Sequence, residues 1–206
     1  MPDIDLDRAY GLKTTQEAQE LYADWAQTYD QDFGAAYGYV APREIAKLYL
    51  AKGGTGPCLD VGAGTGLLAA YLGGITVDAI DLSPEMLEIA REKGLYRHLI
   101  QGDLLAPLEM PDDVYAGAVS SGTFTYGHVG PECLAELLRV VRPGGLFVCS
   151  CVPKVFDGLG FGSALARLQA SGQISPLRFA DIAIYENAEH EHAEDRVLAM
   201  IFRKSI

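Results

Sequence analysis

The chain has 206 residues and carries 28 aspartates and glutamates against 16 lysines and arginines, a formal net charge of −12. An acidic surface repels phosphate backbones and anionic lipid, so we expect neither nucleic acid nor a membrane as a partner. No apolar run has the length of a membrane span, and the first residues lack the basic and apolar regions of a signal peptide, which indicates a soluble, cytoplasmic protein. The length suits a single domain over residues 1–206, and no residue pattern indicates an oligomeric state.

A helix is predicted to begin after residue 14. Thr14 and Glu17 have the spacing of a capping box. Apolar and aromatic residues then recur at helical spacing, namely Ala18, Leu21, Tyr22, Trp25, Tyr29 and Phe33. Two interpretations remain open. The helix could dock permanently on the core, or residues 1–45 could form an N-terminal helical lid over a pocket, to which Tyr29 and Tyr39 would offer hydroxyl groups.

A second helix, predicted over about 42–51, leads to a glycine-rich turn at 59–66 with the sequence Leu-Asp-Val-Gly-Ala-Gly-Thr-Gly. The turn follows a short apolar run that reads as a strand, and residues 67–72 read as the start of a helix. Backbone N–H groups at such a turn point at a ligand, and glycine lets the ligand approach closely. A dinucleotide fingerprint would place its third glycine at position 67, where Leu67 stands. This spacing disfavours a nicotinamide-dependent oxidoreductase.

The remaining elements alternate between strands and helices. Strands are predicted at about 75–81, 97–101, 114–119 and 146–151, and helices at about 84–93, 131–141 and 162–170. Ser83 is placed to cap the helix at 84–93, and Gly94 to end it. The alternation indicates an α/β fold with a doubly wound parallel sheet. Two further strands, at about 178–186 and 195–203, have no helix between them and must form an antiparallel pair.

An acidic residue stands at the end of three successive predicted strands: Asp60, Asp81 and Asp103. The carboxyl ends of parallel strands meet at one edge of a sheet, which is where ligands bind in such folds. A carboxylate there can accept both hydroxyls of a ribose. For Asp60 and Asp103 the alternative is that they cap loop backbone locally.

Four stretches together resemble the class I S-adenosylmethionine-dependent methyltransferases, in particular the small ubiquinone/menaquinone-biosynthesis-like group. They are the glycine turn at 59–66 and the segments 79–87, 102–104 and 137–145. The resemblance extends from about Trp25 to Cys151. It implies a Rossmann-like core over residues 46–206, with a seven-stranded sheet whose last strand is antiparallel.

The resemblance also implies S-adenosylmethionine as the cofactor. The glycine turn would hold its amino-acid part, Asp81 the ribose diol and Asp103 the adenine amino group, while Asp60 would help to orient the ammonium group. The expected cofactor-binding residues are Tyr29, Asp60, Val61, Gly62, Ala63, Gly64, Gly66, Asp81, Leu82, Met86, Asp103, Leu104 and Ser120.

Methyl transfer from a sulfonium is an in-line displacement, so the protein mainly has to align acceptor and methyl group. Tyr126 and His128 follow the fourth strand, where the superfamily positions its acceptor, and we expect both to bind the substrate. His128 is the candidate catalytic base, although it could equally cap the next helix; His98, in an apolar strand, is expected to be structural.

Absent motifs narrow the acceptor. The Asn/Asp-Pro-Pro-Tyr box of planar-nitrogen methylation is missing, and segment 153–176 is too short for an elaborate substrate domain. We therefore expect a small-molecule acceptor. The alternative of another class is a non-catalytic S-adenosylmethionine-binding sensor or partner subunit. The sequence His190-Glu191-His192 lacks a third spaced ligand, so we expect no metal.

Overall fold

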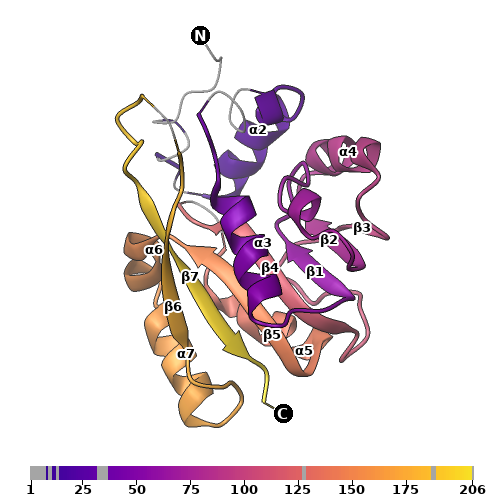
Figure 1. Cartoon of the computed structure of the whole chain (residues 1–206), viewed down its shortest axis with the longest axis vertical. Coiled ribbons are helices and arrows are strands. Elements are labelled where there is room, and N and C mark those ends of the chain that lie inside the picture. Colours follow the sequence, from indigo (N-terminus) through magenta and orange to yellow (C-terminus); the bar gives the residue numbers. More distant parts are fainter. Residues whose placement is uncertain are drawn as a thin grey trace.

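The structure is a computed structural model that describes residues 8, 11–12, 14–31, 37–126, 129–186 and 189–205. Within these ranges a central β-sheet is covered by helices on both faces (Figure 1). The strands are β1 (Cys58–Val61), β2 (Val77–Asp81), β3 (Leu99–Gln101), β4 (Tyr115–Phe124), β5 (Val141–Cys151), β6 (Arg178–Ala183) and β7 (Arg196–Arg203). The helices are α2 (Thr15–Trp25), α3 (Ala41–Ala51), α4 (Pro84–Lys93), α5 (Leu134–Val140), α6 (Pro153–Gly158) and α7 (Phe161–Ala170), with single 3₁₀ turns η2 (Ala69–Tyr71) and η3 (Pro131–Cys133).

The described strands form one seven-stranded sheet in the order β3-β2-β1-β4-β5-β7-β6. Strands β1 to β5 are parallel to their neighbours, whereas β7 pairs antiparallel with both β5 and β6. The prediction of a doubly wound sheet with an antiparallel last strand is therefore confirmed. The order reverses between β1 and β4, so the carboxyl ends of these two strands flank the crevice where such sheets bind ligands.

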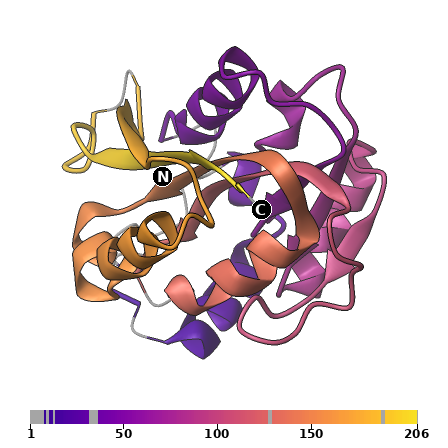
Figure 2. The same ribbon diagram turned by 90° about the horizontal axis from the view of Figure 1, so that it is seen from below.

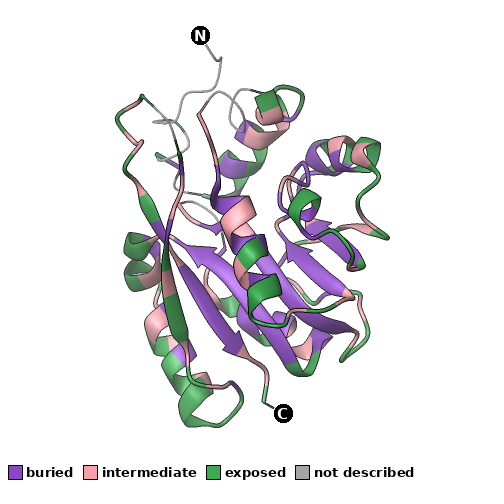
Figure 3. Cartoon of the chain, viewed as in Figure 1, coloured by how far each residue is buried: buried purple, intermediate pink, exposed green. Residues whose placement is uncertain are grey.

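The helices divide between the two faces of the sheet, with α3 on one side and α5 and α7 on the other (Figure 2). Helix α4 packs against β2 and β3. The central strands are buried, while the outer face of α3 and half of the residues of the edge strand β6 are exposed (Figure 3). A parallel strand buried on both faces needs an almost continuous apolar sequence, which residues 115–119 of β4 and 146–149 of β5 have.

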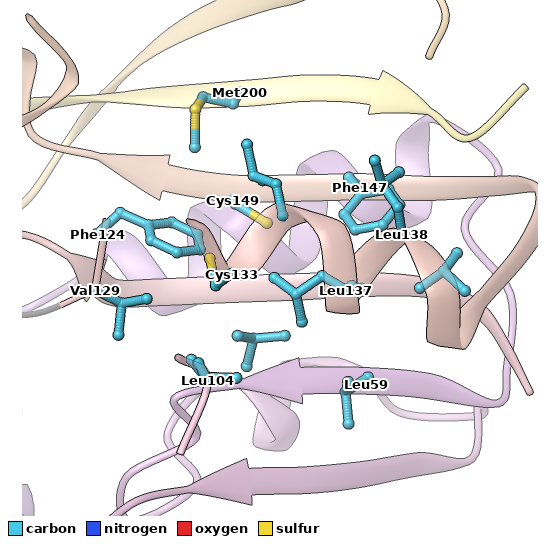
Figure 4. Close-up of a cluster of buried hydrophobic side chains, with 14 of the residues drawn as sticks. Leu59, Leu104, Phe124, Val129, Cys133, Leu137, Leu138, Phe147, Cys149 and Met200 are labelled. Carbon is cyan, nitrogen blue, oxygen red and sulfur yellow. The ribbon is translucent and has the colours of Figure 1, made fainter. Parts of the chain in front are cut away.

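The larger part of the core lies under α5 and α7. Figure 4 shows side chains from β1, β4, β5, β7 and α5 meeting there, among them Leu59, Phe124, Phe147, Met200 and Leu137. A second cluster under α3 is centred on Ile45 and Tyr49, both fully buried. Among the described residues, every helix is too short or too polar to cross a membrane.

The predicted helix ends are confirmed where a side chain defines them. The Met86 N–H donates to Ser83 Oγ at 3.2 Å and Gly94 has a φ of 62°, the left-handed conformation that ends helices. The Glu17 N–H donates to Thr14 Oγ1, also at 3.2 Å.

Other boundaries differ from the sequence prediction. The helix expected at 67–72 is only the 3₁₀ turn η2, and α2 ends at Trp25 instead of continuing to Phe33, which lies outside the described residues. Helix α6 was not predicted. Strand β4 continues to Phe124 through residues that read as a turn, because the Gly122 N–H donates to Ser150 Oγ at 3.0 Å and a β-bulge there keeps β4 paired with β5.

Candidate functional site

A cavity of about 210 Å³ lies at the carboxyl ends of the parallel strands. One end is formed by the glycine turn after β1 and by the residues that follow β2 and β3. The other end is formed by the ends of β4 and β5, the beginning of α3 and the β6–β7 hairpin. Helix α2 and the residues after it contribute Ala18, Gln19, Tyr22 and Tyr29 to the wall. Segments that are distant in sequence therefore surround one space.

Two glycines in the turn serve different purposes. Gly62 has a φ of 66°, and a Cβ there would lie only 2.0 Å from Thr123 Oγ1, so the first glycine is required for packing of the turn against β4. Gly64 has a φ of 53°, and a Cβ there would meet no atom within 4 Å. Because Gly64 lines the cavity, its missing side chain leaves backbone accessible to a ligand.

Asp81 fixes this turn to the end of β2. Its Oδ2 accepts a hydrogen bond from the Gly64 N–H at 2.7 Å, and its Oδ1 accepts one from the Ser83 N–H at 2.9 Å. Burial raises the pKa of the Asp81 carboxyl, and these backbone hydrogen bonds lower it, so they offset part of the shift. Asp81 thus both lines the cavity, as predicted, and shapes the turn, a role that the sequence did not indicate. Each oxygen retains a lone pair for a ligand hydroxyl.

Asp60 is buried beneath the turn and also reaches the cavity. Tyr96 donates its hydroxyl to Asp60 Oδ2 at 2.7 Å. Burial raises the pKa of Asp60 to about 7, although the Tyr96 hydrogen bond opposes this shift. No sequence pattern indicated Tyr96, whose ring packs so closely against Gly66 that a Cβ on Gly66 would lie 2.9 Å from it. Asp60 therefore has a partner of its own, and is not a cap of loop backbone.

Asp103 lies on the wall with the apolar residues Leu82, Met86 and Leu104, as predicted. Its Oδ1 accepts a hydrogen bond from the Leu105 N–H at 2.8 Å, so the local capping considered as an alternative is present. Its other oxygen makes no hydrogen bond within the described part of the chain. One side chain can therefore cap its loop and still accept a donor from the cavity.

Four predicted residues lie outside the wall of the cavity: Val61, Gly66, Ser120 and Tyr126. The fully buried Ser120 hydroxyl donates to the Val61 carbonyl at 2.7 Å, which ties β4 to β1 behind the turn. Tyr126 packs against the hydrophobic core. His128 lies outside the described residues.

The segment after α2 is fixed to the glycine turn. Thr65 Oγ1 donates to Asp30 Oδ1 at 2.5 Å, and Lys93 at the end of α4 forms an ion pair with the same carboxylate. Tyr29, next to Asp30, lines the cavity as predicted and packs edge-on against Tyr22, with ring centroids 5.9 Å apart. The N-terminal segment is thus docked, and it also covers the cavity.

The end of the cavity near β5 contains Tyr39, which was expected there if the N-terminal segment is a lid, together with Ser121 and Tyr185, which the sequence analysis did not assign to a site. Tyr39 and Ser121 share a hydrogen bond of 3.1 Å between their hydroxyl groups. Tyr185, after β6, forms a β-bridge with Tyr39, which places both rings on the wall. Only the insertion of β7 between β5 and β6 brings this hairpin to the cavity, and no local pattern predicts such a contact.

The sequence pattern of the methyltransferase-domain family matches residues 59–149. The chain is 35% identical over 177 residues to methyltransferase-like protein 27 of Homo sapiens, covering 80% of this chain and 71% of that protein. It is 34% identical over 113 residues to the malonyl-[acyl-carrier protein] O-methyltransferase of Serratia marcescens, but spans only 44% of that protein's length.

A similar fold occurs in a crystal structure of an S-adenosylmethionine-dependent methyltransferase from Thermotoga maritima, described as a possible histamine N-methyltransferase. The TM-score is 0.67 at 17% sequence identity, over 91% of this chain and 99% of that one. At this identity the likeness concerns the fold alone.

Proposed function

Because the chain belongs to the class I S-adenosylmethionine-dependent methyltransferases, we propose that it methylates a small-molecule acceptor bound at the β5 end of the cavity. The observation that carries this proposal is that one cavity joins the glycine turn, Asp81 and Asp103 to an end walled by Tyr39, Ser121 and Tyr185. The first end suits the methyl donor, and the second leaves room for an acceptor beside it.

The residues at the first end fit S-adenosylmethionine. Gly64 leaves its backbone open, Asp81 keeps lone pairs for two hydroxyls, and Asp103 keeps one oxygen for an amino group. Leu82, Met86 and Leu104 offer apolar surface to a flat base. The cofactor supplies a methyl group already activated on a sulfonium.

The chain's own contribution to catalysis is alignment and exclusion of water. Holding two reactants in line can lower the barrier by about 7–11 kcal/mol. The docked N-terminal segment supports this role, because Tyr22 and Tyr29 form part of the wall of the cavity. We propose that residues 1–45 act as its lid within a single domain over 1–206, and that His128 approaches the acceptor from the end of β4. Tyr126 packs on the core outside the wall of the cavity, so it has no place in this proposal.

A small acceptor is favoured over a macromolecule for two reasons. The segment between β5 and β6 forms α6 and α7, and Phe161 and Leu165 of α7 are buried in the core, so these helices add no separate substrate domain. The net charge of −12 also opposes binding of nucleic acid. We keep the cytoplasm as the expected location.

Turnover tests the proposal. The full chain is incubated with S-adenosylmethionine and a fractionated extract of small metabolites, and S-adenosylhomocysteine is quantified by mass spectrometry. We expect release that depends on both protein and extract and that is matched by a product 14 mass units heavier. Release only with protein or nucleic-acid fractions would refute the small-molecule assignment.

A further inference from the structure

Four tyrosines surround the acceptor end of the cavity: Tyr22, Tyr29, Tyr39 and Tyr185. They come from α2, from the segment after it, from the turn before α3 and from the end of β6. The rings of Tyr22 and Tyr29 lie 5.9 Å apart and those of Tyr39 and Tyr185 lie 6.0 Å apart. Burial raises the pKa of Tyr29, and the other three phenol groups and Asp30 raise it further, which shows that the four phenol groups lie close together.

The charges on the wall are of one sign. The acidic side chains of the wall, Asp60, Asp81 and Asp103, lie at the donor end, and no lysine, arginine or histidine in the described ranges joins them. His190 is near, but its ring packs edge-on against Tyr185 with centroids 4.8 Å apart, outside the residues that line the cavity. Among the described residues, the acceptor end therefore offers aromatic rings and hydroxyl groups but no lysine, arginine or histidine.

This combination discriminates between acceptor classes. A carboxylate or phosphate acceptor would lose its hydration without gaining a cationic partner, which is unfavourable. A nitrogen that carries or develops positive charge gains from the faces of aromatic rings. Resting on the proposed methyl transfer, we propose that the acceptor is a small amine and that the four tyrosines form the wall that recognises its nitrogen.

Methyl transfer to an amine moves the positive charge onto the acceptor nitrogen, which the tyrosine rings would contact. The lone pair of the neutral amine nitrogen attacks the methyl carbon, and the carbon–sulfur bond breaks with its electron pair remaining on sulfur. The positive charge passes from sulfur to nitrogen, and the methylated nitrogen then releases a proton to solvent water. The tyrosine wall thus stabilises the positive charge more strongly in the transition state than in the bound reactants. An interaction lowers the activation barrier only if it strengthens in this way.

The test measures binding, and does not depend on turnover. The probes are choline, which mimics a methylated nitrogen, its uncharged isostere 3,3-dimethylbutan-1-ol, and the anion 3,3-dimethylbutanoate. Each is titrated calorimetrically into the full chain saturated with S-adenosylhomocysteine. We expect choline to bind about tenfold or more tightly than the alcohol, and the anion to bind most weakly. Equal affinities, or preference for the anion, would overturn the proposal.

Matched variants locate the effect. Tyr39→Phe keeps the ring and loses the hydrogen bond to Ser121, whereas Tyr39→Leu removes the ring. Tyr185→Phe and Tyr185→Leu repeat the comparison, and Tyr71→Leu, at a tyrosine that is 48% exposed on η2, is the control. Choline preference should survive in the Phe and control variants and fall in the Leu variants. If the preference for choline over the alcohol is unchanged by loss of either ring, the cation binds elsewhere and the proposed role of the tyrosines is wrong.

The same titrations distinguish failure of the proposed function from failure of the amine assignment. If S-adenosylhomocysteine does not bind at all, methyl transfer in this cavity fails and the amine assignment fails with it. If it binds and choline shows no preference, methyl transfer stands and only the amine assignment is wrong.

Discussion

At the scale of single residues, the site depends on carboxylates that are already engaged by the chain. The sequence located Asp60, Asp81 and Asp103 correctly at strand ends, because an acid directly after an apolar run is a local signal. It did not reveal that Gly64, Ser83, Tyr96 and Leu105 donate to them. Which groups donate depends on how the turn folds back over β2 and on the path of the chain after α4. Neither can be predicted from a local sequence pattern.

Asp81→Asn should therefore affect both binding and folding. The amide keeps one acceptor oxygen but loses the charge that receives the Gly64 and Ser83 N–H groups. We expect the affinity for S-adenosylhomocysteine to fall about 10- to 100-fold and the free energy of unfolding to fall by about 1–3 kcal/mol, measured by calorimetry and urea denaturation. Asp103→Asn, at an exposed carboxylate, is the matched comparison. If Asp81→Asn leaves the affinity for S-adenosylhomocysteine unchanged, this carboxylate does not bind the cofactor.

Asp60 should give the stability a pH dependence of unusual sign. Burial raises its pKa to about 7 in the folded state, well above the ordinary value of 3.8. Between these values the folded state holds more protons than the unfolded state, so this carboxyl lowers the free energy of unfolding as pH rises, by at most about 1.4 kcal/mol per pH unit.

Asp60→Asn should remove that slope. Urea denaturation at pH 5, 6, 7 and 8 would show the difference in unfolding free energy between variant and natural chain moving in favour of the variant as pH rises, and levelling off above about 7. Tyr96→Phe removes the hydrogen bond that lowers the pKa of Asp60, so in this variant the loss of stability should continue to a higher pH than in the natural chain. A constant difference across this range would mean that Asp60 titrates normally.

His128 is the candidate base for an acceptor that must lose a proton, as a protonated amine must before it attacks. His128→Ala should lower turnover at neutral pH by up to about 10²–10⁴-fold, with the affinity for S-adenosylhomocysteine unchanged. The loss should shrink at high pH, where the amine is already deprotonated. Full activity at neutral pH would leave alignment as the chain's main contribution.

At the scale of elements, the strand and helix sequence was predictable because apolar periodicity and helix caps are local. Ser83, Pro84 and Gly94 define α4 almost completely. The exceptions arise where tertiary contacts decide, as in β4, whose last residues look like a turn but pair with β5. The same limit explains why Tyr39 and Tyr185 were not joined in advance: their bridge links segments 146 residues apart in the chain.

Limited proteolysis can test how the N-terminal segment, residues 14–31, is held in place. Asp30 holds it to the glycine turn through Thr65 and to α4 through Lys93. Asp30→Ala should loosen residues 14–31 and raise their rate of limited proteolysis several-fold, since a partly exposed contact of this kind contributes up to about 1 kcal/mol. Asp24→Ala, at an exposed acid of the same segment, is the control and should cleave at the natural rate.

Ligand distinguishes the two interpretations of this segment. If it is a lid, S-adenosylhomocysteine should slow the cleavage of the natural chain and change the fluorescence of Trp25, which is buried in the cluster formed with Leu21. Cleavage and fluorescence unaffected by saturating ligand would identify a permanently docked helix.

At the scale of the whole molecule, the sheet order places every described feature of the site at one edge. The resemblance of the glycine turn and its neighbours predicted the family, the fold class and the cofactor, and these are confirmed. The acceptor was not predictable in the same way, because its wall is assembled from four separate segments, and their convergence is a property of the folded chain.

Hydrogen–deuterium exchange with S-adenosylhomocysteine tests the central claim that this one cavity holds the methyl donor. Exchange of the full chain is followed with ligand, with NAD as the control, and without either. We expect S-adenosylhomocysteine alone to protect residues 62–66, the end of β2 with Ser83, residues 103–105 and the segment 14–31 together. Protection confined to other parts of the chain, or equal protection by NAD, would contradict the account.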